Sequence, residues 1–288
     1  MKPRLAIIGL GLIGGSFARA LRAADAVATI HGFDPDPSQR QAALALGVID
    51  HAAASAAEAV AAADVVVLAV PVLRTAEALA AVLPALKAGA VVTDVGSTKQ
   101  SVLADVQQLC GTLPGWFVAA HPIAGTEKSG VAASFAGLFK GKRLILTPHA
   151  AQSATALAAV RALWTAAGAR VVEMDAARHD AIFAATSHLP HLLAYSFVEL
   201  LSQAEGSEEI FSNAGGGFRD FTRIASSSPQ MWHDIVRANA PEVLRLLTAQ
   251  INQLQKMQGL VEQQQWAGLR ALFERARAAR ERHLADIE

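Results

Sequence analysis

The sequence has little cysteine, no excess charge of either sign and no long apolar run. Its 288 residues include one cysteine, which cannot form a disulfide within the chain, so nothing points to an oxidising compartment. Lys and Arg total 25, as do Asp and Glu, whereas nucleic-acid-binding proteins normally carry a basic excess. The longest strongly apolar stretch, around Val65–Leu73, is far shorter than the roughly 20 residues of a membrane span. We therefore expect a soluble, cytoplasmic protein without nucleic-acid or membrane partners.

The first part of the chain alternates short apolar runs with alanine-rich helical stretches. The early runs are continuously apolar, as expected of strands that helices cover on both faces. Strands that alternate with helices predict right-handed crossovers and an α/β fold of the Rossmann type, with a doubly wound parallel sheet. The predicted strands are Leu5–Ile8, Ala28–Phe33, Val65–Val70, Ala90–Val95, Phe117–Ala120, Leu144–Thr147 and Arg170–Val172.

The strand pattern stops near Met174, and the rest of the chain reads as helical. The predicted helices are Arg178–Ala204, Glu208–Ala214, Pro229–Ala238 and Pro241–Ala279. We therefore expect a Rossmann-type domain over residues 1–174 and an all-α domain over 175–288; the fingerprint and the family resemblance described below imply dinucleotide binding for the first, and substrate binding and dimerisation for the second. Apolar residues in the last segment recur every three or four positions, with an interruption at Gln258, which fits either a helix packed on its own domain or a seam between two subunits. They are Leu244, Leu247, Ile251, Leu254 and Val261.

A glycine fingerprint, Gly9-Leu10-Gly11-Leu12-Ile13-Gly14, lies between the first strand and a helical pattern. Such glycines allow a tight turn and let the backbone approach a pyrophosphate at the helix N-terminus. Asp34 ends the second strand 20 residues after Gly14, where a carboxylate binds the adenosine ribose. The same carboxylate repels a 2′-phosphate, so we predict NAD rather than NADP, although Arg40 is nearby. The predicted cofactor contacts are Gly9, Gly11, Leu12, Ile13, Gly14, Asp34, Val70, Pro71 and Ser97.

Two polar segments directly follow the fourth and fifth predicted strands. They are Asp94–Lys99 and His121–Glu127. The carboxyl ends of strands in a doubly wound sheet face the ligand crevice, so Ser97 and Lys99 should project near the nicotinamide. A neutral His121 at the same edge could accept a proton from a substrate hydroxyl as hydride leaves the carbon.

Each of these residues also has a structural interpretation. Ser97 could cap the following helix, and a lone histidine is more often structural than catalytic. The pKa of His121 would start from about 6.5, and a nearby Glu127 or a bound carboxylate could raise it. In the helical part, Arg219 and Arg223 offer planar forks for a carboxylate, or could pair with Asp220 or Glu127. No Cys/His cluster has metal-ligand spacing, and we predict no metal.

In combination, these segments resemble the prephenate dehydrogenase family, whose members are also called arogenate or cyclohexadienyl dehydrogenases according to substrate. The matching segments occur in the family's order and cover the chain from residue 7 to about 240. They are GLGLIGGS at 9–16, DVGSTK at 94–99, HPIAGTEKSG at 121–130, SHLPH at 187–191, GGGFRDFTRIA at 215–225 and Met231-Trp232. The histidine and arginine segments are specific to the family, whereas the glycines alone are not.

The resemblance implies a role for each matching residue. His121 would polarise the ring hydroxyl, and Ser97 would lie between that histidine, the hydroxyl and the nicotinamide. Arg223 would bind a substrate carboxylate, with the other pocket residues positioning the substrate. The implied substrate-binding residues are Arg223, His191, Glu127, Thr126 and Trp232. The family is dimeric through its helical domain, which agrees with the spacing from Leu244 onward and implies a homodimer here.

The implied reaction is the NAD-dependent oxidative decarboxylation of prephenate to 4-hydroxyphenylpyruvate, or of arogenate to tyrosine, in tyrosine biosynthesis. Hydride leaves the hydroxyl-bearing carbon, carbon dioxide leaves the opposite carbon, and the ring becomes aromatic. The sequence does not distinguish the two substrates. We expect no fused chorismate mutase or regulatory domain, so any inhibition by tyrosine would act at the active site.

Two other functions fit parts of the sequence. A 3-hydroxyacid dehydrogenase of the related two-domain type would use a catalytic lysine on the first helices after the linker, but residues 178–195 contain no lysine. A catalytically silent NAD-binding sensor would keep the glycines and Asp34 without needing His121, Ser97 and Arg223 together. The joint presence of those three residues favours an enzyme.

Overall fold

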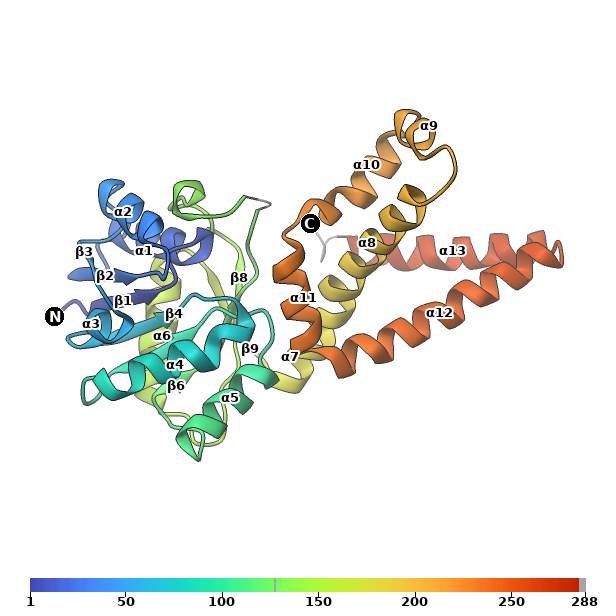
Figure 1. The fold of residues 1–288 in the computed structure, drawn as a ribbon. Coiled ribbons are helices and arrows are strands. Elements are labelled where there is room, and N and C mark those ends of the chain that lie inside the picture. The colour runs from blue at the N-terminus through green and yellow to red at the C-terminus, as the bar shows by residue number, and fades with distance from the viewer. Residues whose placement is uncertain (127, 285–288) are drawn as a thin grey trace. The chain divides into compact units, whose positions relative to one another are not determined.

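The computed structural model describes residues 1–126 and 128–284 (Figure 1). The chain folds into two compact units, Met1–Ala240 and Pro241–Glu288. The first unit therefore includes both the α/β part and most of the helices that follow it. The functional division expected at residue 174 stays a prediction. In the described part of the chain, no helix is both long and apolar enough to cross a membrane.

The centre of the first unit is a six-stranded, all-parallel sheet with the strand order β3-β2-β1-β4-β5-β6. The Rossmann-type fold predicted from the alternating pattern is thus confirmed. The strands are β1 Arg4–Ile8, β2 Thr29–Phe33, β3 His51–Ala52, β4 Val65–Leu68, β5 Val91–Asp94 and β6 Phe117–Val118. The two-residue β3 was not predicted, because so short a strand leaves no hydrophobic pattern.

Successive residues of β1 face opposite sides of this sheet, and both sides are buried. Leu5 and Ile7 belong to one apolar cluster, with Phe17 of α1 and Trp164 of α6. Ala6 and Ile8 belong to the other cluster, which α3, α4 and α5 cover. The helices around the sheet are α1 Leu12–Ala23, α2 Pro37–Ala45, α3 Ala56–Val60, α4 Thr75–Val82, α5 Gln100–Cys110 and α6 Ala154–Ala166. Coverage of both faces explains why the strands are continuously apolar.

A second, three-stranded sheet of order β7-β8-β9 lies after the parallel sheet in the chain. Its strands are β7 Ala120–Pro122, β8 Arg143–Leu146 and β9 Arg170–Glu173. β7 pairs antiparallel with β8, and β8 pairs parallel with β9. The single strand predicted over Phe117–Ala120 is therefore wrong, because the chain leaves one sheet after Val118 and enters the other at Ala120.

The helices after β9 differ from the prediction in where they break. They are α7 Ala176–Phe183, a π-helical segment Ala184–His188, α8 Leu189–Ser202, α9 Ser207–Ser212, α10 Gly216–Thr222 and α11 Pro229–Ala238. The π-helical turn ends two residues before Pro190, which has no N–H to continue the regular α-helical ladder. α10 was missed because Gly215–Gly217 reads as a break, whereas the helix begins at Gly216.

The second unit contains two helices where the sequence predicted one. α12 spans Ala240–Glu262 and α13 spans Trp266–Arg282 (Figure 1). The chain turns at Gln264, whose φ of 52° lies in the left-handed region. Residues 262–265 are Glu-Gln-Gln-Gln, without a glycine or proline that would mark the break.

Candidate functional site

The fingerprint glycines form a tight turn at the carboxyl end of β1. Gly9 has a φ of +99°, and a Cβ there would lie 2.3 Å from the Ala69 carbonyl oxygen. A Cβ on Gly14 would lie 2.2 Å from the Gly9 carbonyl oxygen, whereas a Cβ on Gly11 would meet nothing within 4 Å. α1 begins at Leu12 without a side-chain cap, so its first N–H groups are available to an anion. This open backbone cradle fits the pyrophosphate of a dinucleotide.

Asp34 lies directly after β2 and is held against the same turn. Its carboxylate accepts hydrogen bonds from Leu10 N at 2.8 Å and Asp36 N at 3.0 Å. Arg40 donates to the main-chain oxygen of Asp34, and its guanidinium lies 5.5 Å from the Phe33 ring centroid. The carboxylate therefore sits beside the cradle, where a ribose would bind, while Arg40 is engaged by the backbone.

Three other predicted cofactor residues follow neighbouring strands at this carboxyl edge. Val70 and Pro71 come after β4, and a Cβ on Gly9 would lie 3.2 Å from Val70 N, so this backbone packs against the fingerprint. Ser97 comes after β5 and is half-buried. The interpretation of Ser97 as a helix cap is wrong, because α5 begins at Gln100 with Lys99 in the N-cap position.

Lys99 does not face the cofactor edge as expected. Its side chain is fully buried, forms an ion pair with Asp94, and donates to the Ala120 carbonyl oxygen at 2.7 Å. Asp94 also accepts from Ala120 N at 3.0 Å. Burial lowers the pKa of Lys99, and the adjacent Asp94 carboxylate opposes that shift. The pair ties the end of β5 to the residue before His121, which is a structural function.

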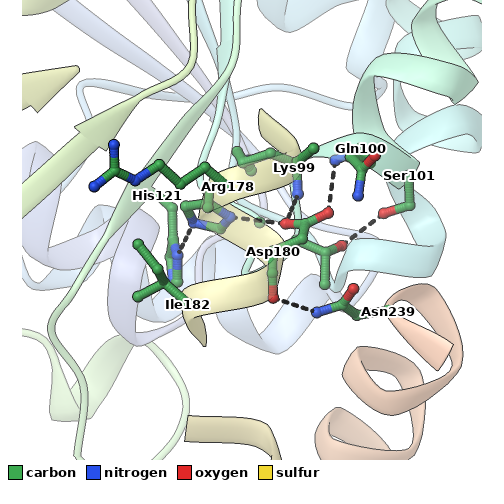
Figure 2. Close-up of polar contacts among 12 residues, drawn as sticks. Lys99, Gln100, Ser101, His121, Arg178, Asp180, Ile182 and Asn239 are labelled. Atoms are coloured by element: carbon green, nitrogen blue, oxygen red, sulfur yellow. Dashed lines mark hydrogen bonds and ion pairs between the residues drawn. The ribbon is translucent and has the colours of Figure 1, made fainter. Parts of the chain in front are cut away.

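His121 is the middle residue of β7, in the second sheet, and does not end a parallel strand as predicted. Its Nδ1 lies 2.8 Å from Nε2 of His179, and Nδ1 of His179 lies 2.7 Å from Oδ1 of Asp180. Figure 2 shows these contacts, with His121 on one side of α7 and Lys99 and Gln100, at the start of α5, on the other. Because β7 follows β6 after one residue, His121 still comes directly after the carboxyl edge of the parallel sheet.

Burial lowers the pKa of His121 well below its ordinary value, and His179, Lys99 and His188 lower it further. The imidazole is therefore neutral at pH 7, as a proton acceptor must be. The pKa increase considered from the sequence is not what the described surroundings of His121 produce. Glu127, which was to cause it, lies outside the described residues.

His191 and Trp232 form one wall of a cavity of about 370 Å³ between α8 and α11. Their rings stack with centroids 3.5 Å apart, and His191 Nδ1 lies 2.9 Å from the Ser187 carbonyl oxygen. Burial lowers the pKa of His191, and the positive charge of Arg223 lowers it further, which places that arginine nearby. The cavity is lined by His191, Leu192, Tyr195, Pro229, Trp232, His233, Val236, Arg237 and Ala240.

Among the residues that the structure describes, the other candidates for substrate binding lie at the surface. Arg223 begins a 3₁₀ turn, Arg223–Ser226, and is exposed. Arg219 is also exposed and lies 3.8 Å from the Asp220 carboxylate, as its structural interpretation anticipated. Thr126 is exposed, and its hydroxyl accepts from Lys128 N at 3.2 Å. Among the residues with described positions, no group of three or more His, Cys, Asp or Glu could hold a metal ion.

His179, Asp180 and Asn239 were not predicted from the sequence. All three are buried. Asp180 accepts from Lys99 N at 2.8 Å and Gln100 N at 2.9 Å, and Asn239 donates to the Asp180 carbonyl oxygen at 2.9 Å (Figure 2). The adjacent His179 and Asp180 were visible in the sequence, but their partners lie more than 50 residues away along the chain.

Two family models match nearly the whole chain. The model described as "Prephenate dehydrogenase, nucleotide-binding domain" matches residues 17–173, and "Prephenate dehydrogenase, dimerization domain" matches residues 175–275. Among curated proteins, the cyclohexadienyl dehydrogenase of Zymomonas mobilis is 39% identical over 96% of this chain and 94% of its own. The family models and this relative both match the α/β part and the helical part of the chain.

Solved structures agree with these matches. The prephenate dehydrogenase of Aquifex aeolicus, solved with hydroxyphenyl propionate and NAD⁺, has a TM-score of 0.91 and 35% identity, covering 98% of each chain. The arogenate dehydrogenase of Synechocystis has a TM-score of 0.81 and 26% identity, covering 97% of this chain and 99% of its own. From the two family models and these relatives together, the chain belongs to the prephenate dehydrogenase family.

Proposed function

We propose that this protein catalyses the NAD-dependent oxidative decarboxylation of prephenate, arogenate or both, in tyrosine biosynthesis. The observation that carries the proposal is a neutral histidine, His121, directly after the carboxyl edge of a sheet whose first turn forms an open dinucleotide cradle. The family models match residues 17–173, which include Asp34 and His121, and residues 175–275, which include the helices that would bind the substrate.

The cofactor site is assigned to the turn after β1 and its neighbours. The N–H groups at the start of α1 would hold the pyrophosphate, and the Asp34 carboxylate would accept from the ribose hydroxyls. NAD⁺ supplies the hydride acceptor when it is bound.

Because Asp34 repels a 2′-phosphate, kcat/KM should favour NAD⁺ over NADP⁺ by at least about tenfold, or about 1.4 kcal/mol. Equal use of the two cofactors would show that Asp34 does not read the ribose.

His121 is the proposed general base. It would accept the proton of the ring hydroxyl while hydride leaves the same carbon, and Ser97 would hold the hydroxyl in place. Loss of carbon dioxide makes the ring aromatic, so the chain's residues need only orient the substrate and accept one proton.

The substrate carboxylates are assigned to the helical part of the first unit. Arg223 offers a bidentate partner for one carboxylate, and the stacked His191 and Trp232 form an aromatic wall beside it. Glu127 and Thr126 are proposed to position the substrate from the loop after β7. These roles come from the family resemblance together with the electrostatic influence of Arg223 on His191.

We also propose a homodimer that forms through the helices after residue 175. α12 and α13 expose a series of large apolar side chains, which an isolated subunit would leave in water. They are Leu244, Ile251, Leu254, Val261, Trp266 and Phe273. The match to a dimerization domain covers all six.

The test is NADH production with prephenate and with arogenate, measured side by side on the purified protein. The proposal expects turnover of at least one substrate, and the ratio of the two kcat/KM values assigns the preference. A 3-hydroxyacid dehydrogenase would instead oxidise simple 3-hydroxyacids, and a silent sensor would bind NAD⁺ without any turnover. Failure with both cyclohexadienes would overturn the proposed function.

A further inference from the structure

Asp180, His179 and His121 form a chain of hydrogen bonds that runs from the N-terminus of α5 to the proposed base. We propose that His179 and Asp180 are positioning residues that keep the Nε2 lone pair of His121 free for the substrate and then share the proton that it accepts. This inference rests on the proposed function, because it assigns His121 the role of base. Figure 2 shows the chain of contacts beside the first turn of α5.

The direction of each hydrogen bond follows from Asp180. Its carboxylate accepts from the main-chain N–H groups of Lys99 and Gln100, which can only donate. Burial opposes ionisation of this carboxyl, but the hydrogen bonds from His179, Gln100 and Lys99 outweigh it and lower the pKa of Asp180. Asp180 is therefore a carboxylate, and it accepts from whichever imidazole nitrogen faces it.

That requirement sets the tautomers of both histidines. His179 must carry its proton on Nδ1, which donates to Asp180 Oδ1 at 2.7 Å. The neutral ring then has a lone pair on Nε2, which lies 2.8 Å from His121 Nδ1. His121 must therefore donate through Nδ1, so its lone pair is on Nε2. That nitrogen is the one left to accept a substrate proton.

Packing holds this arrangement in place. The side chains of His179 and Asp180 are buried, with 0% and 1% exposure. Phe183 packs against both imidazoles, with ring centroids 5.0 Å from His121 and 4.5 Å from His179. Asn239 donates to the main-chain oxygen of Asp180 and so fixes the turn of α7 that bears the pair. A flipped imidazole would have to displace these contacts.

The proton can be followed through the chain without any further reactant. The substrate hydroxyl gives its proton to His121 Nε2 while hydride leaves for NAD⁺ and carbon dioxide departs. His121 Nδ1 then shares its proton with His179 Nε2 or passes it there. The proton on His179 Nδ1 stays on that nitrogen, hydrogen-bonded to Asp180. The positive charge thereby moves onto the imidazole that contacts Asp180, and the hydrogen bond to that carboxylate favours the protonated form of His179.

Two substitutions at one position separate the tautomer from simple packing. His179→Phe fills the space but accepts nothing from His121, whereas His179→Gln offers an amide oxygen that can accept from Nδ1 but cannot take a proton. We expect His179→Phe to lower kcat about 100-fold or more, with KM for substrate and NAD⁺ changed less than about threefold. His179→Gln should recover about tenfold of that loss. In both variants the acid limb of kcat should move to higher pH, because loss of the His179 imidazole removes one of the groups that lower the pKa of His121.

A ¹⁵N NMR measurement on the free protein tests the tautomer without using activity. The His121 imidazole, assigned from the spectrum of a His121→Gln variant, should show a protonated Nδ1 and an unprotonated Nε2 above pH 7. His179→Phe should change this pattern. A protonated Nε2 in the wild type, or near-wild-type kcat with an unchanged acid limb in His179→Phe, would overturn the proposal. Absence of turnover with the expected tautomer would instead overturn the proposed function alone.

Discussion

The chemistry of His121 is set by its neighbours more than by its own side chain. Burial and the nearby His179, Lys99 and His188 lower its pKa, so its neutral form extends well below pH 6.5. In the free enzyme, the acid limb of kcat/KM should therefore lie below pH 6.5, and activity should be lost as pH falls through the lowered pKa. If the pKa of the base were ordinary or raised, the acid limb would instead lie at pH 6.5 or above.

His121→Asn tests the base directly. Asparagine can hydrogen-bond the ring hydroxyl but cannot accept its proton, so kcat should drop by roughly 10²–10⁴. Binding of substrate and NAD⁺ should persist, and the acid limb should disappear from the pH profile. His51→Asn, on the exposed β3, serves as a control and should keep wild-type kinetics. If His121→Asn turns over at a near wild-type rate with an unchanged acid limb, His191 becomes the next candidate base.

Arg223 and Arg219 form a matched pair for testing carboxylate recognition. Arg223 is near enough to His191 to lower its pKa, whereas Arg219 is exposed beside Asp220. Arg223→Ala should raise KM for the substrate about 10- to 100-fold, since a charged hydrogen bond contributes about 1.5–3 kcal/mol. The Kd for NAD⁺ should be nearly unchanged, and Arg219→Ala should change either constant less than about twofold. Equal effects of the two substitutions would contradict the assignment.

At the scale of elements, the fingerprint turn combines two separate demands on glycine. Gly9 and Gly14 are required by the fold, because a Cβ at either would collide with main-chain carbonyl oxygens. Gly11 meets no such obstacle, so the structure alone does not require glycine there. Its bare backbone is explained by the close approach of a pyrophosphate.

Gly9→Ala and Gly11→Ala should therefore fail in different ways. Gly9→Ala should lower the free energy of unfolding by more than about 1 kcal/mol, because its φ and the contact with Ala69 both resist a Cβ. Gly11→Ala should fold with wild-type stability but bind NAD⁺ at least about tenfold more weakly. Urea unfolding and NAD⁺ titration of both variants measure the two effects. Unchanged NAD⁺ affinity in Gly11→Ala would place the pyrophosphate elsewhere.

The sequence predicted those elements whose signal is local. The parallel strands read as apolar runs because both faces are covered, and the glycine turn and Asp34 have fixed spacing. The exit of the chain from one sheet at Val118 and its entry into another at Ala120 left no local mark. The turn at Gln264 likewise depends on one residue with positive φ, in a stretch of glutamines that has no glycine or proline.

The candidate site was predictable only where a single segment carries it. His121, Ser97 and Arg223 lie in segments that resemble a known family. The residues that lower the pKa of His121 come from α7, from the turn before α5 and from the π-helical segment before α8, and their meeting is a property of the whole fold. Asp180 shows the difficulty, because its carboxylate caps a helix that begins 80 residues earlier in the chain.

At the scale of the whole molecule, this site also makes folding sensitive to acid. Burial lowers the pKa of His121, His179, His188 and His191. Between the lowered and the ordinary pKa, the unfolded chain binds more protons than the native state, so stability is complete above about pH 6.5 and decreases as pH falls. All four histidines therefore make the protein less stable as pH falls.

His188 gives this effect a magnitude, because burial lowers its pKa to about 4. At pH 5 its contribution to the free energy of unfolding should have fallen by about 2 kcal/mol relative to pH 7. His188→Gln removes this titration. The difference in free energy of unfolding between pH 7 and pH 5 should therefore become smaller by about 2 kcal/mol, even if the variant is less stable at both pH values. Val160→Ala, a core substitution without a titratable group, should lower stability equally at both pH values. Urea unfolding at the two pH values measures all three proteins, and a wild-type pH difference in His188→Gln would mean that His188 is not the group that titrates.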